Sequence, residues 1–167
     1  MKAIVSVDLN WGIGCGGQLL ERISPDMKQF KQKTLNKVVV MGRETFESLP
    51  KMEPLKERIN IVLSKDNSFN NDKVVICRSL NQLFNELLKY NTEDVFVIGG
   101  QSVYEQLLTY CTKVYITKIQ KEYRADKYFV NLDEDKNWEL VTESELHEYN
   151  NIKFSYATYV NKDYYKL

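Results

Sequence analysis

The sequence predicts one α/β domain spanning residues 1–167, with a mainly parallel, twisted central sheet flanked by helices and an antiparallel C-terminal hairpin. Three observations support this fold. The length of 167 residues with 43% apolar content suits one domain with a real core. Short apolar runs alternate with helical patterns through the first two-thirds of the chain. Alternating strand patterns without a helix between them fill the last third.

Near-continuous apolar runs mark the first strands. Runs of this kind are typical of parallel strands that are covered by helices on both faces. They occupy residues 3–7, 37–42, 58–64 and 94–100. Between the last two runs, residues 79–89 place leucines and a phenylalanine on one helical face, and Ser79 with Gln82 forms a capping box.

The C-terminal third contains three further strand patterns, at residues 113–119, 138–145 and 153–160. The last two alternate, so we expect an antiparallel pair added at one edge of the sheet. All seven glycines lie at or before Gly100, and the three prolines lie between Pro25 and Pro54. The first two-thirds should therefore carry the turns that shape a ligand site.

Composition excludes several classes of protein. Lys plus Arg number 23 and Asp plus Glu number 23, whereas nucleic-acid binders usually carry a basic excess. No apolar run approaches the ~18 residues that a membrane span needs, and Asp8 interrupts any signal-peptide core. The three cysteines are widely spaced and the single histidine, His147, has polar neighbours. We expect a cytoplasmic monomer without disulfides, a metal site, a nucleic-acid partner or a membrane partner.

Two strand-to-helix junctions are candidate ligand sites, because ligands of open α/β sheets bind outside the carboxyl ends of the strands. One strand ends in Gly99-Gly100, where a ligand can approach the backbone closely. Another ends in Gly42 and is followed by Arg43 and Thr45, which can donate to a phosphate. Close helix–strand packing and a solvated Arg43 are the alternatives. Together the junctions favour a dinucleotide whose pyrophosphate is held from both sides.

A third glycine cluster matches the GxGxxG spacing at Gly12, Gly14 and Gly17. The dinucleotide-binding motif requires a helix that begins within the glycines. Here QLLERISPD follows, and Pro25 delays the next helix. We therefore interpret this segment as a mobile glycine-rich loop.

The segment ISPDMKQF begins the first helix and carries a candidate anchor. Ser24 is the expected N-cap and Pro25 the first helical position. Asp26 then lies in the first turn, with Met27 and Phe30 as apolar neighbours. Such an acid either complements the helix dipole or anchors a ligand that carries paired N–H donors.

These segments together resemble the dihydrofolate reductase family over essentially the whole chain. The resemblance rests on Ile13-Gly14 after the first strand, on Asp26 followed by Phe30-Lys31, and on VVVMGRETFESL, RINIVLS, VFVIGGQSVYEQLL and VYITKI in this order. It implies NADPH-dependent reduction of 7,8-dihydrofolate to tetrahydrofolate by hydride transfer. It also implies that antifolate-type small molecules bind.

The resemblance further implies a substrate site. Asp26, supported by Thr117, would hold the pterin 2-amino group and the adjacent ring N–H. It would also favour protonation of the nitrogen next to the carbon that receives hydride. Arg58 would bind the α-carboxylate of the folate glutamate. The substrate-binding residues implied are Ile4, Val5, Asp26, Met27, Phe30, Leu55, Arg58 and Thr117.

The cofactor residues implied fall into two groups, one around the pyrophosphate and one around the adenosine and its 2′-phosphate. The first comprises Gly99, Gly100, the helix from Gln101, Arg43, Glu44 and Thr45. The second comprises Ser64, Lys65 and Arg78. The remaining positions implied are Ser6, Ile13, Gly14, Gly17, Gly42, Leu63, Ile98, Ser102, Val103 and Tyr104.

One departure from the family pattern concerns the residue before the first helix. The family usually has a Leu-Pro-Trp run there, whereas this chain has Leu19-Leu20-Glu21. Glu21 is expected either at the pocket mouth close to Asp26 or in solvent. Three other interpretations stay open: a pyrimidine reductase of riboflavin synthesis, which would not need Arg58, a non-catalytic pterin- or nucleotide-binding module, and a purely structural domain.

Overall fold

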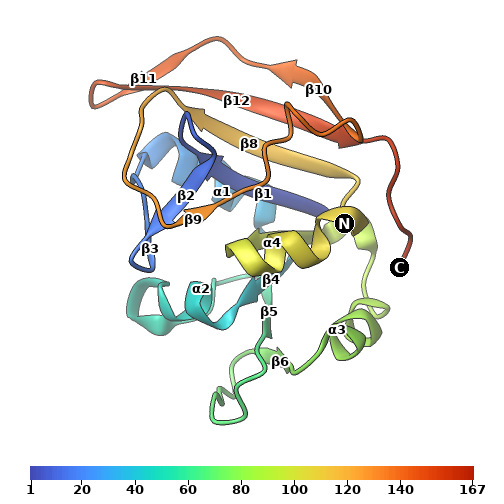
Figure 1. The fold of residues 1–167 in the computed structure, drawn as a ribbon. Helices are drawn as coiled ribbons and strands as arrows, with labels where there is room; N and C mark the ends of the chain where they lie inside the picture. The colour runs from blue at the N-terminus through green and yellow to red at the C-terminus, as the bar shows by residue number, and fades with distance from the viewer.

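A computed structural model describes residues 1–167, and a nine-stranded sheet runs through its centre (Figure 1). The strand order is β10-β12-β8-β1-β7-β4-β5-β6, with β11 paired to β12. The strands of this sheet are β1 (Lys2–Val7), β4 (Val38–Gly42), β5 (Ile59–Leu63), β6 (Val75–Cys77), β7 (Val95–Gly99), β8 (Lys113–Ile119), β10 (Trp138–Glu143), β11 (His147–Tyr149) and β12 (Ile152–Asn161).

The other elements surround this sheet. The helices are α1 (Ser24–Thr34), α2 (Arg43–Glu47), α3 (Leu80–Leu87) and α4 (Gln101–Leu107). Short 3₁₀ turns lie at Pro50–Met52, Thr92–Asp94 and Leu108–Tyr110. A second, three-stranded sheet contains β2 (Gly12–Cys15), β3 (Gln18–Leu19) and β9 (Lys127–Tyr128). None of the helices combines the length and the apolarity needed to cross a membrane.

The pairing pattern confirms the predicted fold class. β1 runs parallel to β7 and β8, and β4, β5 and β6 continue the parallel part. β12 pairs antiparallel with β8, β10 and β11, which places the C-terminal strands at one edge. The parallel core is apolar on both faces because helices cover both faces: Val38 to Met41 of β4 are all buried.

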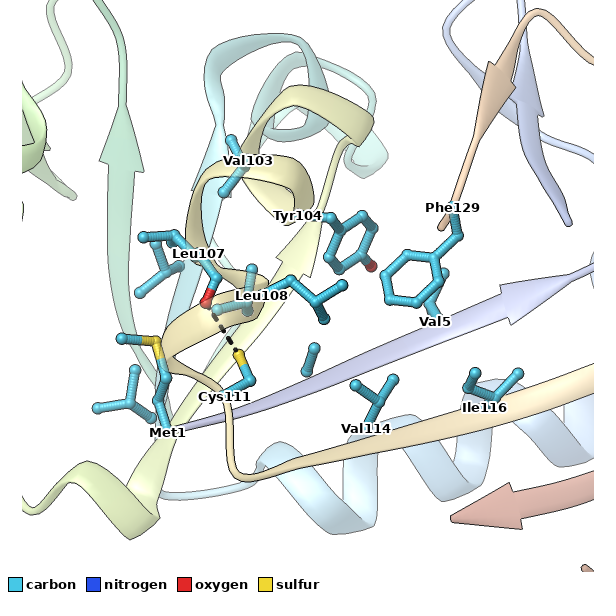
Figure 2. Close-up of a cluster of buried hydrophobic side chains, with 14 of the residues drawn as sticks. Met1, Val5, Val103, Tyr104, Leu107, Leu108, Cys111, Val114, Ile116 and Phe129 are labelled. Atoms are coloured by element: carbon cyan, nitrogen blue, oxygen red, sulfur yellow. Dashed lines mark hydrogen bonds between the residues drawn. The ribbon is translucent and has the colours of Figure 1, made fainter. Parts of the chain in front are cut away.

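Strand alternation divides the core into two sides. Val5 of β1 lies in one buried cluster with Tyr104 and Leu107 of α4, and Figure 2 shows Cys111 and Met1 at the end of this cluster away from Val5. Ile4 lies on the opposite face, where it packs with the cluster of β4 and β7 residues that includes Phe46 of α2. Odd-numbered residues of β1 therefore face the α4 side of the sheet, and even-numbered residues face the α2 side.

The glycine-rich segment forms a β-hairpin and not the irregular loop that was predicted. Cys15 pairs with Gln18 across a two-residue turn, Gly16-Gly17, with φ values of 58° and 77°. Positive φ at both central residues is the requirement of the tight hairpin turn that glycine satisfies. β9, which lies more than a hundred residues later in the chain, pairs with the edge of β2 that β3 leaves free.

The helix starts differ in detail from the predicted ones. Ser79 Oγ accepts from Gln82 N at 3.2 Å, but Gln82 Oε1 accepts from Arg78 N at 2.7 Å instead of completing the predicted box on Ser79. The prediction of Ser24 as N-cap is wrong, because Ile23 occupies that position. Ile23 is buried in a cluster with residues of β8 and β12, and this packing sets where α1 begins.

Candidate functional site

Several of the predicted site residues lie at the edge of the sheet where the parallel strands end. Ser6 near the end of β1 is in register with Thr117 of β8. Met41 of β4 is in register with Gly99 of β7, so both glycine junctions lie at this same edge. This arrangement follows from the parallel pairing, because the carboxyl ends of parallel strands share one edge.

Asp26 lies over this edge on the first turn of α1, and two strands donate hydrogen bonds to its carboxylate. Thr117 Oγ1 donates to Asp26 Oδ1 at 2.5 Å, and Ser6 Oγ donates to Asp26 Oδ2 at 2.6 Å. Each oxygen thus accepts one hydroxyl and keeps a further lone pair for a ligand. A carboxylate held in this way can receive two parallel N–H donors.

A third hydroxyl side chain continues the row. Tyr156 of β12 is in register with Thr117, so Ser6, Thr117 and Tyr156 lie side by side on three neighbouring strands. Burial, and then the negative charge of Asp26, raise the pKa of Tyr156. The phenol is therefore neutral throughout the physiological range.

Apolar side chains flank the carboxylate on the α2 side of the sheet. Ile4 and Leu55 pack against the buried cluster on that side, and Phe30 follows Asp26 by one helical turn. Met27, beside Asp26, is 41% exposed. Val5 does not share this surface: its side chain packs in the opposite cluster with α4, so only its backbone faces the site.

Arg58 is held next to the C-terminal end of α1. Its Nη1 donates to Thr34 Oγ1 at 3.0 Å and its Nε donates to the Lys56 carbonyl at 2.9 Å. Burial lowers the pKa of this guanidinium, although it remains charged at any physiological pH. The side-chain amide of buried Asn60 accepts from Leu55 N through Oδ1 and donates to the Leu55 carbonyl through Nδ2. These two bonds fix the loop that carries Arg58.

The two glycine junctions touch each other. A Cβ at Gly100 would lie 3.3 Å from Thr45 Oγ1, and a Cβ at Gly42 would lie 3.1 Å from Val103 Cγ2. Gly99 has φ 122°, which side chains rarely permit, and the peptide bond to Gly100 is cis. The backbone is therefore bare on this side of α4, with no side-chain atoms from the glycines to keep a ligand away.

Three cationic side chains follow β4, β5 and β6, and two of them bond to neighbouring residues. Arg43 pairs with Glu47 at 2.8 Å and lies 3.8 Å from Asp66. Arg78 Nη2 donates to the Phe69 carbonyl at 2.6 Å, and its Nη1 donates to the Asp66 carbonyl. In contrast, Lys65 is exposed.

Ser64 and Leu63 complete the end of β5. Ser64 is buried, and its Oγ accepts from Asp66 N at 3.2 Å, so its own O–H remains available to a ligand. Leu63 packs against the core on the α4 side, whereas Glu44 at the start of α2 is exposed.

Helix α4 is tied to both neighbouring sheets. Tyr104 Oη donates to the Ile4 carbonyl at 2.8 Å, and Gln101 Oε1 accepts from Tyr128 N at 2.9 Å. Ser102, also on this helix, is exposed. The other residues predicted to contact the cofactor are Ile13, Gly14 and Gly17 in the hairpin, and Ile98 in β7.

Comparisons with known proteins identify the family of this chain. The sequence profile of the dihydrofolate reductase family matches residues 1–161. The chain belongs to the dihydrofolate reductase family. It is 41% identical to a dihydrofolate reductase of Schistosoma mansoni over 150 residues, covering 81% of both chains, and 34% identical to the type 9 enzyme of Escherichia coli, covering 96% of this chain and 93% of that one.

A solved structure of the family shares the fold. Dihydrofolate reductase from Enterococcus faecalis, complexed with NADP(H) and RAB-propyl, superposes with a TM-score of 0.85 at 32% identity. The match covers 97% of this chain and 96% of that one. The agreement extends through the C-terminal antiparallel strands, which lie outside the parallel core.

Glu21, the departure from the family pattern, has a partner other than Asp26. Tyr123 Oη donates to Glu21 Oε2 at 2.9 Å, linking the hairpin segment to the loop after β8. Burial, and then this hydrogen bond, raise the pKa of Tyr123 to about 12. Glu21 is half-buried in this contact, so the alternative in which it simply points into solvent is wrong.

A hollow lies on the other side of α1 from the apolar residues of the site and shares Tyr156 with the hydroxyl row. It has a volume of about 560 Å³ and is lined by Pro25, Lys28, Gln29, Gln32, Lys33 and Tyr156. The helical spacing places the α1 members of this set on the side of α1 turned away from Met27 and Phe30. None of the predicted substrate residues lines it.

Sequence reasoning missed four side chains that hold the site together. Ser6 was expected only beside the cofactor, yet its hydroxyl bonds Asp26. Thr34 and Asn60 position Arg58 and its loop, and Tyr123 binds Glu21. Polar residues within apolar runs were the available signal for Ser6 and Asn60, because a buried polar group needs a partner. The sequence carries no comparable signal for Tyr123.

Proposed function

We propose that this chain catalyses NADPH-dependent reduction of 7,8-dihydrofolate to 5,6,7,8-tetrahydrofolate. One observation supports this function above the others: a carboxylate with one hydroxyl donor on each oxygen lies at the sheet edge that also carries the two glycine junctions. Membership of the family supports the same reaction. A riboflavin pyrimidine reductase or a non-catalytic module is not needed to explain the site.

Asp26 binds and orients the pterin in this proposal. Its two oxygens accept the 2-amino group and the adjacent ring N–H, which form a paired donor edge. The negative charge then favours a proton on the nitrogen beside the carbon that receives hydride. Water delivers that proton, because the side chains nearest to the carboxylate are hydroxyl groups and not a second acid.

The residues at the glycine junctions fit a dinucleotide. The bare backbone of Gly42, Gly99 and Gly100 forms a cradle that a Cβ would crowd. Thr45 lies against this cradle, and the free O–H of Ser64 with the exposed Lys65 suits a 2′-phosphate. NADPH, when bound, supplies the hydride. The protein supplies its position and the surrounding charge.

Arg58 binds the α-carboxylate of the folate glutamate in this proposal. Its Nη1 and Nε are fixed by Thr34 and Lys56, so the guanidinium is oriented before substrate arrives. An oriented guanidinium can bind a carboxylate with little further loss of side-chain freedom. Leu55 and Phe30 provide apolar contacts for the ring between pterin and glutamate.

We also propose that a single chain is the active unit, because its own residues supply the carboxylate, the guanidinium and both glycine junctions that the reaction needs. Cys15, Cys77 and Cys111 are all free, which suits a reducing compartment such as the cytoplasm. An antifolate that carries a diaminopyrimidine group should compete with dihydrofolate, since it presents the same paired N–H donors to Asp26.

The direct test is to follow NADPH absorbance with purified protein and dihydrofolate. We expect turnover that needs both reactants and is inhibited by a diaminopyrimidine. Asp26→Asn under the same conditions is the control for contaminating enzyme. Absence of turnover at micromolar protein, with the chain folded by circular dichroism, would overturn the proposed function.

A further inference from the structure

We propose that Ser6 is a positioning residue for the Asp26 carboxylate, fixing the rotation of the carboxylate and supporting its charge through a hydroxyl hydrogen bond. The inference rests on the proposed role of Asp26. It gives the Ser6 side chain a task separate from the cofactor contact expected at this position. The supporting observation is the 2.6 Å bond from Ser6 Oγ to Asp26 Oδ2.

The position of Ser6 in the sheet makes it a rigid donor. β1 pairs in parallel with β8 along its whole length, where Ser6 lies opposite Thr117, and the Ile4 carbonyl on the other edge of β1 accepts a hydrogen bond from Tyr104 Oη. These bonds restrict the backbone on either side of Ser6. The neighbours Val5 and Val7 are buried on the α4 side, and alternation directs Ser6 to the face that α1 covers. A serine hydroxyl has one side-chain torsion before its oxygen, so a bond from this backbone is well defined.

Two hydroxyl donors on different strands fix the orientation of the Asp26 carboxylate, which one donor cannot do. Thr117 holds Asp26 Oδ1 from β8, and Ser6 holds Oδ2 from β1. With either donor alone, the carboxylate can rotate about its Cβ–Cγ bond and keep that one hydrogen bond. With both donors, the carboxylate plane is fixed, and the remaining lone pair on each oxygen has a set direction. A ligand with paired N–H groups then binds an oriented acceptor and loses less free energy to ordering.

The hydrogen bond also affects the charge of the carboxylate. A hydroxyl that donates to a carboxylate stabilises the ionised form, so its removal makes protonation easier. The titratable group that faces Asp26 from the sheet is Tyr156 of β12. Its pKa is raised, so it stays neutral from pH 5 to 9 and contributes no titration of its own there. A change in ligand affinity on removing the Ser6 hydroxyl therefore does not arise from Tyr156 changing its charge.

The experiment compares Ser6→Ala with the parent protein, with Ser6→Thr as the conservative variant that keeps a hydroxyl. Ser155→Ala is the matched control. Ser155 is a buried serine of the same sheet, and it donates to a carboxylate oxygen of Glu143 at 2.8 Å on the other side of β8 from Ser6. Both alanine substitutions remove one hydroxyl–carboxylate bond, but only one of these bonds is to Asp26.

The measurements are Kd for 2,4-diaminopyrimidine from pH 5 to 9, kcat/KM for dihydrofolate, and KM for NADPH. For Ser6→Ala we expect the diaminopyrimidine Kd to rise about 5- to 10-fold at pH 8, as for one hydrogen bond to a charged group. KM for NADPH should change by less than twofold. Ser6→Thr should restore the parent diaminopyrimidine Kd, and Ser155→Ala should leave that Kd unmoved.

Two results would overturn the proposal. One is Ser6→Ala with the parent diaminopyrimidine Kd. The other is a shift of equal size in Ser155→Ala, which would indicate a general loss of stability. A parent protein that binds diaminopyrimidine but does not reduce dihydrofolate would instead refute the proposed function, and the binding series would still test Ser6.

Discussion

The proposed substrate half and the proposed cofactor half of the site are built in opposite ways. Around Asp26, side chains from three distant segments hold one another through hydrogen bonds. Around Gly42 and Gly99, the backbone is bare, and charged side chains such as Arg43 pair with near neighbours. The substrate half therefore depends on hydrogen bonds between side chains, whereas the glycine cradle of the cofactor half depends on the absence of side-chain atoms. Removing a side-chain group should damage the substrate half, and adding a side chain should damage the glycine cradle.

The largest effect should follow from removing the charge of Asp26. Asp26→Asn keeps the shape but loses the charge that favours the protonated pterin, so kcat/KM for dihydrofolate should fall at least ~10²-fold at pH 8. The deficit should narrow toward pH 5, because solvent can then protonate the substrate. Steady-state kinetics across pH 5 to 8 checks this, and a variant within twofold of the parent throughout would reduce Asp26 to a helix-dipole acid.

Adding one methyl group to the cofactor half should have the next largest effect. Gly99→Ala puts a side chain at φ 122°, against Tyr104 at 3.5 Å, so we expect a loss of about 1–3 kcal/mol of stability. KM for NADPH should rise about tenfold or more. Gly16→Ala is the control: φ is 58° and no atom lies within 4 Å of the added Cβ. Equal NADPH binding by Gly99→Ala and Gly16→Ala would show that the cradle does not need a bare backbone.

Removing one positive charge, at Lys65 or at Arg78, should have a moderate effect on the preference for NADPH. The effect on stability should differ between the two positions. Lys65 is exposed, so Lys65→Gln should erode the preference for NADPH over NADH about three- to tenfold, mostly through KM, and leave Tm unchanged. Arg78→Gln should erode the same preference and also lower Tm, because Arg78 holds the carbonyls of Asp66 and Phe69. Equal kcat/KM for both cofactors in the parent would refute the 2′-phosphate assignment.

The smallest effect should come from the contact between Tyr123 and Glu21. Tyr123→Phe removes one hydrogen bond, so the free energy of unfolding should fall by about 0.5–1.5 kcal/mol. The pKa of Tyr123 is raised to about 12, so its stabilising effect is complete below the unfolded value of about 10. It is lost only as the pH rises from there through 12.

The deficit of Tyr123→Phe in urea unfolding should therefore be the same at pH 6 and at pH 9, with kcat within twofold of the parent. Glu21→Gln, which keeps an acceptor oxygen, is the control. A deficit that vanished at pH 9 would contradict this account of Tyr123.

The difference between the halves also explains which features the sequence could predict. Apolar runs and glycine junctions are local patterns, so the parallel sheet and the cofactor edge followed from them. The role of Ser6 depends on α1 crossing β1, and the second sheet depends on β9 pairing with β2 from more than a hundred residues away. The start of α1 at Ile23 depends on packing against β8 and β12. Contacts between distant segments leave no periodic signal in one sequence.

The measurement that tests this division most directly is binding of two ligands to two variants. Kd values for NADPH and for 2,4-diaminopyrimidine should be measured for the parent, Asp26→Asn and Gly99→Ala at pH 7. We expect Asp26→Asn to lose diaminopyrimidine affinity at least tenfold while NADPH stays within about twofold, and Gly99→Ala to show the reverse. Loss of both ligands to the same degree in each variant, with both proteins folded, would contradict the division of the site into two separately built halves.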